Sequence, residues 1–165
     1  MNRHWAVAAA VAAALRVITG AGATAADAPV DPVQWTAALV SGDTPGTANV
    51  ATLAVSGVIE EGWHVYALEQ LPGGPTPLRV ALDQNVIATA AGPATGSPAQ
   101  KEYSASFGLD THYYTHSFAV RLPVQLSAQR PAGRQLIPLS VRFQACSDRE
   151  CLLPRTLHLT AVTIL

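Results

Sequence analysis

The only two cysteines of the chain, Cys146 and Cys151, lie five positions apart near its carboxyl end. Four polar residues separate them, Ser147 to Glu150, and three of these are charged, which predicts a turn. Cysteines that flank such a turn can reach the Cα separation that a disulfide needs. The chemistry open to the pair is therefore either a structural crosslink or reversible thiol–disulfide exchange.

A crosslink across so short a loop stabilises a fold only modestly. Loop-closure entropy gives on the order of 2 kcal/mol, less than a disulfide between distant strands contributes. The preceding residues, 137–143, alternate apolar and polar side chains, which predicts a strand. Continued by three residues, this alternation places Cys146 on the polar, accessible face. An accessible pair at a hairpin tip permits thiol exchange, and the residues alone leave the redox and the structural roles open.

The amino terminus has the features of a secretory signal peptide. Arg3 and His4 precede an apolar, alanine-rich run from Trp5 to Leu15, which is too short to span a bilayer. Residues 23–25, Ala-Thr-Ala, form a small-x-small cleavage site. We therefore predict a cleaved signal peptide over 1–25 and one mature domain over 26–165. An uncleaved amino-terminal anchor is the alternative.

The charge of the mature chain argues against a nucleic-acid partner. Without residues 1–25, eight Lys and Arg stand against eleven Asp and Glu, a net charge of −3, with no basic patch. No later stretch is apolar and long enough to cross a membrane. The predicted location is the periplasm or the exterior, where cysteines pair by default.

From residue 33 on, the sequence predicts short strands separated by turns. No segment has helical periodicity over ten residues or more. Residues 41–47, 91–99 and 109–115 are interpreted as turns or loops, and Pro123 predicts an edge or a bulge in its strand. The fold class predicted from regularly spaced strands is an all-β, immunoglobulin-like antiparallel β-sandwich. The expected strands cover residues 33–40, 48–59, 63–68, 78–82, 86–90, 103–107, 118–126, 137–143 and 156–164.

Residues 143–154, Phe-Gln-Ala-Cys-Ser-Asp-Arg-Glu-Cys-Leu-Leu-Pro, resemble a known active-site hairpin. It belongs to the amino-terminal periplasmic domain of the thiol:disulfide interchange protein DsbD. That hairpin typically starts with aromatic-Gln-small-Cys and ends in a Cys followed shortly by Pro. Residues 62–66, Gly-Trp-His-Val-Tyr, and 72–75, Pro-Gly-Gly-Pro, resemble an early strand and loop of the same family. The likeness spans residues 33–164, although Leu153 stands where a second proline is common.

The resemblance implies a domain in which Cys146 and Cys151 shuttle electrons. The electrons would come from a membrane-embedded partner, and they would reduce disulfides of other periplasmic proteins. The family's full-length members also carry a membrane domain and a thioredoxin-like domain, so a separate membrane-embedded electron donor is expected here. The family shields its disulfide with an aromatic cap loop. The side chains implied for the cap or the surroundings of the active site are Phe107, Tyr113, Tyr114, Phe143 and Pro154. Neither a cofactor nor a metal is implied.

Two functions of other classes are the alternatives. One is a non-catalytic immunoglobulin-like interaction module in which the hairpin disulfide is structural. The other is a metal-binding protein that uses the cysteines with His112 and His116, which are four positions apart. His64 and His158 lie in strand-like contexts and are interpreted as packing or solvated residues. The sequence has no phosphate loop, no nucleophile elbow and no dinucleotide fingerprint.

Overall fold

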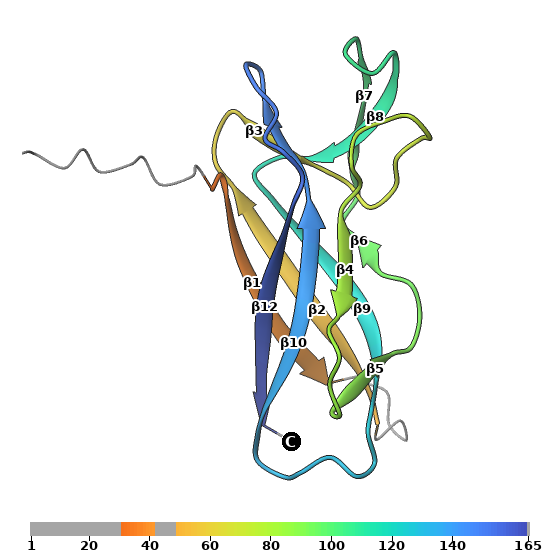
Figure 1. The fold of residues 1–165 in the computed structure, drawn as a ribbon, viewed down its shortest axis with the longest axis vertical. Coiled ribbons are helices and arrows are strands. Elements are labelled where there is room, and N and C mark those ends of the chain that lie inside the picture. The colour runs from red at the N-terminus through yellow and green to blue at the C-terminus, as the bar shows by residue number, and fades with distance from the viewer. Residues whose placement is uncertain (1–30, 42–48, 165) are drawn as a thin grey trace, which may run out of the picture. The chain divides into compact units, whose positions relative to one another are not determined.

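The computed structural model of the protein describes residues 31–41 and 49–164 (Figure 1). All regular structure in these residues is β-strand, which confirms the all-β prediction. They contain no helix long and apolar enough to cross a membrane. The predicted signal peptide and most of the predicted turn over 41–47 lie outside the described residues. The strands are β1 (Val33–Ser41), β2 (Val50–Ile59), β3 (Trp63–Tyr66), β4 (Arg79–Leu82), β5 (Ala88–Ala90), β6 (Thr95–Gly96), β7 (Gln100–Ser104), β8 (Leu109–Tyr114), β9 (Ser117–Leu126), β10 (Arg134–Phe143), β11 (Ala145–Ser147) and β12 (Arg155–Ile164).

The strands form two sheets, which we call the large and the small sheet. The large sheet has the order β4-β10-β12-β1-β2-β9-β5, and β6 also pairs with β9. It curls so that β4 approaches β5 and β9. The small sheet has the order β11-β3-β8-β7, and Figure 1 shows β3, β7 and β8 beyond one end of the long strands. All named pairings are antiparallel except that of β1 with β12. The fold is an immunoglobulin-like β-sandwich.

The core is built by alternation along the long strands. In β2, in β9 and in β10 from Ile137 on, every second side chain is buried, because successive residues of a strand point to opposite faces. Each fully buried aliphatic side chain contributes about 1.5–3 kcal/mol relative to exposure. The core ends near Phe143, whose ring lies 4.9 Å from that of Trp35 between centroids. The central members are Leu53, Val55, Val120, Val124, Ile137, Leu139 and Val141.

Pro123 sits in an interior strand rather than at an edge. Strand β9 pairs with β2 on one side and with β5 and β6 on the other. The carbonyl of Pro123 accepts a hydrogen bond from the backbone N–H of Ala91 (2.8 Å). The backbone nitrogen and oxygen of one residue in an antiparallel strand point to the same side. The missing N–H therefore faces the gap between β5 and β6 and costs no bond to β2.

Residues 109–114 form a strand, β8. The prediction of a loop or bend over 109–115 is wrong, because Leu109–Tyr114 pairs with β7 on one side and with β3 on the other. Thr111 and Tyr113 point to one face of the small sheet and His112 and Tyr114 to the other. Both faces carry polar or aromatic groups, so no apolar–polar period marks this strand. Its partner β7 also begins earlier than predicted, at Gln100.

Candidate functional site

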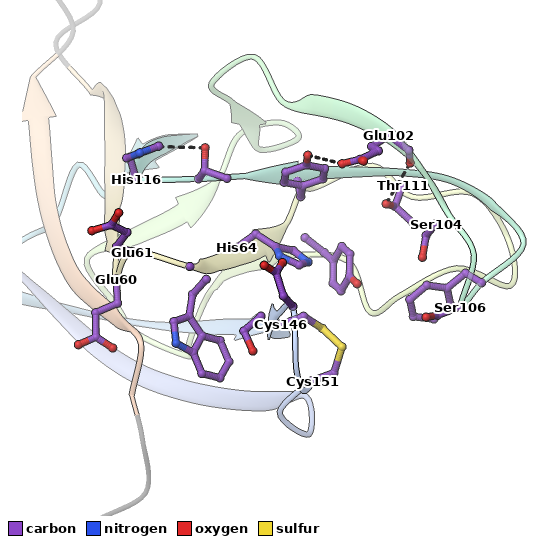
Figure 2. A pocket seen from close by; sticks show the side chains of 18 of the residues that line it. Glu60, Glu61, His64, Glu102, Ser104, Ser106, Thr111, His116, Cys146 and Cys151 are labelled. Atoms are coloured by element: carbon purple, nitrogen blue, oxygen red, sulfur yellow. Dashed lines mark hydrogen bonds between the residues drawn. A yellow bond between two sulfur atoms is a disulfide. The ribbon is translucent and has the colours of Figure 1, made fainter.

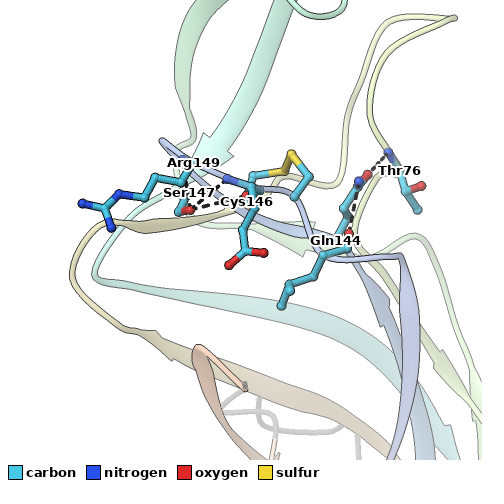
Figure 3. The surroundings of a disulfide bond; sticks show 8 residues. Thr76, Gln144, Cys146, Ser147 and Arg149 are labelled. Atoms are coloured by element: carbon cyan, nitrogen blue, oxygen red, sulfur yellow. Dashed lines mark hydrogen bonds between the residues drawn. A yellow bond between two sulfur atoms is a disulfide. The ribbon is translucent and has the colours of Figure 1, made fainter. Parts of the chain in front are cut away.

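The cysteine hairpin crosses from one sheet to the other. Strand β10 leaves the large sheet after Phe143, and β11 joins the small sheet beside β3. Between them, the side chain of Gln144 accepts the N–H of Thr76 (3.0 Å) and donates to the carbonyl of Leu152 (3.4 Å). Figure 3 shows these two bonds at the base of the hairpin. Gln144 therefore ties both arms of the hairpin to the loop between β3 and β4, which contains Thr76.

The tip of the hairpin is a turn closed by Ser147. Its backbone N–H donates to the carbonyl of Glu150 (2.8 Å). Its Oγ accepts the N–H groups of Arg149 (3.2 Å) and Glu150 (3.3 Å). Serine satisfies turn backbone in this way, which explains why four polar residues fold back so tightly. The predicted turn is confirmed.

Cys146 and Cys151 form a disulfide and face each other across an antiparallel bridge, with Cα atoms 4.0 Å apart. Ala145 belongs to the core, so Cys146 faces away from it, as the alternation predicted. The prediction that this face is accessible is wrong, since Cys146 is only 1% exposed whereas Cys151 is exposed. The small sheet supplies neighbours that a single strand pattern does not reveal. The two cysteines therefore differ in their exposure to a partner.

The disulfide borders a cavity of about 440 Å³, which we call the disulfide cavity. Its floor is the outer face of the small sheet, and the hairpin forms one wall (Figure 2). Side chains from β3, β7, β8 and β11 line it, together with the turn before β3. Its lining includes Glu60, Glu61, His64, Tyr66, Glu102, Tyr103, Phe107, Tyr113, Cys146, Asp148 and Cys151.

Aromatic rings cover the floor of the disulfide cavity. The ring of His64 packs against those of Tyr66 (5.2 Å between centroids) and Tyr113 (5.1 Å). Phe107, on the loop between β7 and β8, lies edge-on to Tyr66 at 6.0 Å. The Tyr113 hydroxyl donates to Glu102 (2.7 Å), and this hydrogen bond raises the pKa of Tyr113. Burial raises the pKa of Tyr66, so both phenols stay neutral at physiological pH.

Acidic groups dominate the charge of the disulfide cavity. Four carboxylates line it, from Glu60, Glu61, Glu102 and Asp148, and no described lining residue is Lys or Arg. Negative charge near a cysteine opposes the thiolate, whereas positive charge would favour it. The charge of the disulfide cavity therefore gives no support to a thiolate on its buried side, where Cys146 lies.

Burial lowers the pKa of His64 from its ordinary value of 6.5, and the charges of Asp148 and Glu102 offset part of this effect. Because its pKa is lower in the folded than in the unfolded state, the stability it contributes is complete above pH 6.5. That contribution is lost as the pH falls from there through the folded-state pKa. We expect the free energy of unfolding of a His64→Gln variant to depend less on pH than that of the wild type.

Urea denaturation between about pH 7.5 and pH 5 would measure this dependence. The matched control is His112→Gln, which removes an imidazole from the face of β8 that points away from the disulfide cavity. Equal pH slopes for the wild type and His64→Gln would contradict the assignment.

The structure separates the aromatic residues that the family resemblance singled out. Phe107 and Tyr113 line the disulfide cavity with both cysteines. Tyr114 lies on the other face of β8, 4% exposed, with its ring stacked on that of Phe118 at 4.7 Å. Phe143 is part of the core, and Pro154 is half-buried between the hairpin and β12. Phe107 and Tyr113 are thus the two cap candidates that the fold brings to the disulfide.

His64, Tyr66 and Glu102 also line the disulfide cavity and were not predicted from the sequence to lie near the cysteines. The alternation of His64 and Tyr66 around Val65, which is in the core, is a signal that both share one outer face. That alternation does not predict which strands pair with β3. His112 and His116 line different cavities, so their spacing does not bring them together. No group of three or more His, Cys, Asp or Glu side chains suited to a metal occurs among the described residues.

Residues 32–162 match the family model of the N-terminal domain of the thiol:disulfide interchange protein DsbD. No curated protein sequence matches this chain. The DsbD N-terminal domain of Neisseria meningitidis, solved in the reduced form, is 16% identical with a TM-score of 0.51, over 79% of this chain and 86% of that chain.

A second solved structure has the same fold. The N-terminal periplasmic domain of ScsB from Proteus mirabilis is 16% identical with a TM-score of 0.53 and covers 79% of this chain. The present chain covers 47% of that one, about half of its length. Because the family model extends over more than three quarters of the sequence, from β1 to β12, this chain belongs to the DsbD N-terminal domain family.

Proposed function

We propose that this protein is a periplasmic thiol–disulfide exchange module. The Cys146–Cys151 pair passes two electrons from a separate membrane-embedded reductase to exported client proteins. Family membership and the bonded cysteine pair support the exchange chemistry. The observation that carries the proposal is the disulfide at the edge of an open cavity, with one cysteine exposed and the other buried.

The reaction follows from this difference in access. In the reduced protein, the thiolate of Cys151 attacks one sulfur of a client disulfide, and the other client sulfur leaves as a thiolate. Cys146 then attacks the sulfur of Cys151, so that the Cys146–Cys151 bond forms and the bond to the client breaks. The client disulfide has become two thiols, and the protein has become oxidised. The membrane-embedded donor restores the two thiols by the same exchange in reverse.

The periplasmic location rests on the predicted signal peptide and on the family. The ScsB domain of the same fold is a periplasmic domain by its own description. An oxidising compartment is also where a cysteine pair persists as a disulfide between rounds of reduction. A donor on the membrane then has direct access to the exposed Cys151.

The reduction potential of the Cys146–Cys151 pair tests the proposal. Structural disulfides of exported proteins have potentials below about −300 mV, whereas exchanging pairs lie above this value. We expect the potential to be higher than about −300 mV. Equilibration of the purified protein with defined ratios of reduced and oxidised dithiothreitol, followed by alkylation of free thiols, measures it. A potential well below that value would favour the interaction module with a structural disulfide.

A further inference from the structure

His64 is the titratable side chain directly opposite Cys146 in the small sheet. Strands β3 and β11 are antiparallel, with Cys146 in register with His64. The neighbouring pair in the register, Ala145 and Val65, points into the core, so His64 and Cys146 share the outer face. Side chains directly opposite in antiparallel strands have Cβ atoms about 4.5–5.5 Å apart. Figure 2 shows His64 beside Cys146 in the disulfide cavity.

The surroundings of His64 suit a group that takes up a proton. It is flanked by Tyr66 of β3 and Tyr113 of β8, and two carboxylates act on it, Glu102 of β7 and Asp148 of the hairpin turn. Burial lowers the pKa of His64, so the imidazole is unprotonated at neutral pH and has a nitrogen free to accept. The two carboxylates stabilise the imidazolium once it forms.

We propose that His64 accepts the proton of the Cys146 thiol as Cys146 attacks the mixed disulfide on Cys151. This inference rests on the proposed function. The Cys146 S–H bond breaks, the proton moves to the unprotonated ring nitrogen of His64, and the Cys146–Cys151 bond forms. The bond between Cys151 and the client breaks, and the client sulfur that was bonded to Cys151 leaves as a thiolate. The proton on His64 then passes to that thiolate or to water, which restores the neutral ring.

The position of Cys146 explains why this step needs a base. Cys146 is 1% exposed, so water has little access to its thiol. The carboxylates of the disulfide cavity oppose spontaneous formation of the thiolate. Cys151 is exposed and can lose its proton to solvent. His64 therefore acts on the second exchange, the resolution of the mixed disulfide, and leaves the first attack unchanged.

Rapid mixing of the reduced protein with oxidised glutathione, acid quenching and intact-mass spectrometry follow both steps. The mixed disulfide with glutathione appears in the first step and decays in the second. We expect His64→Gln to form it at the wild-type rate and to resolve it at least about tenfold more slowly. The wild-type resolution rate should fall as the pH drops through the His64 pKa, and the variant should lack this inflection. His112→Gln is the matched control and should behave as the wild type.

A second variant separates proton transfer from packing. His64→Phe keeps an aromatic ring between Tyr66 and Tyr113 but has no titratable group. Slow resolution in both variants supports the inference, whereas wild-type resolution in His64→Phe would overturn it, because ring packing would then suffice. Wild-type resolution and an unchanged pH profile in His64→Gln would also overturn it. If the reduced wild-type protein forms no mixed disulfide at all, the proposed function fails, and this inference fails with it.

Discussion

A Cys146→Ala variant is expected to accumulate a mixed disulfide through Cys151, whereas a Cys151→Ala variant is not. Cys151 is exposed, and Cys146 is 1% exposed on the floor of the disulfide cavity. Thiol exchange requires an in-line approach of thiolate and disulfide, so access decides which sulfur meets the partner first. Without Cys146 the adduct on Cys151 has no resolving thiol and persists.

The comparison of the two variants is internally matched. Both lose the same crosslink, whose contribution to stability is on the order of 2 kcal/mol, so a difference between them cannot come from that loss. Incubation of each reduced variant with oxidised glutathione, followed by intact-mass spectrometry, measures adduct formation. We expect Cys151→Ala to react at least about tenfold more slowly than Cys146→Ala. Equal rates, or a faster Cys151→Ala, would reverse the assigned order of attack.

The strand alternation made most of the fold predictable. In β9 and β10 the apolar residues recur at every second position and face a single core, so the pattern and the burial agree. The same parity places Cys146 on the face opposite Ala145. Parity gives the face of a strand but says nothing about what covers that face. The chain changes sheets at Gln144, and the cover comes from β3 and β8, which precede the hairpin by more than thirty residues.

The same reason explains why the disulfide cavity was only partly predictable. The cysteines and the likeness of their hairpin are local in sequence, so they could be identified directly. His64, Glu102 and Tyr113 reach the site only through the pairings β3–β11, β3–β8 and β7–β8. These pairings depend on long-range register, which a single sequence does not specify. Strand β8 was missed as well, because polar and aromatic residues on both of its faces conceal its period.

Phe143→Ala is expected to lower stability strongly and to leave the reduction of the disulfide unchanged. Phe107→Ala is expected to lower stability little and to speed that reduction. Phe143 is buried in the core, packs against Trp35, and has the Arg155 guanidinium 5.0 Å from its ring centroid. Its truncation leaves a cavity, for which we expect a loss of about 3–5 kcal/mol in the free energy of unfolding. Phe107 is half-buried on the loop between β7 and β8, so we expect its truncation to cost less than about 1.5 kcal/mol.

The rate at which the disulfide is reduced should change in Phe107→Ala and not in Phe143→Ala. The Phe107 ring lies edge-on to Tyr66 and lines the disulfide cavity together with both cysteines. Removing this ring opens the disulfide, so Phe107→Ala should be reduced by dithiothreitol several-fold faster than the wild type. Phe143 faces the core, and at a temperature where the variant is folded its truncation should leave that rate unchanged. Tyr103→Ala, an exposed residue of β7 at the rim of the cavity, is a control for loss of an aromatic ring. If Phe107→Ala were reduced at the wild-type rate, Phe107 would not shield the disulfide. Tyr113 would then be the remaining cap candidate that lines the disulfide cavity.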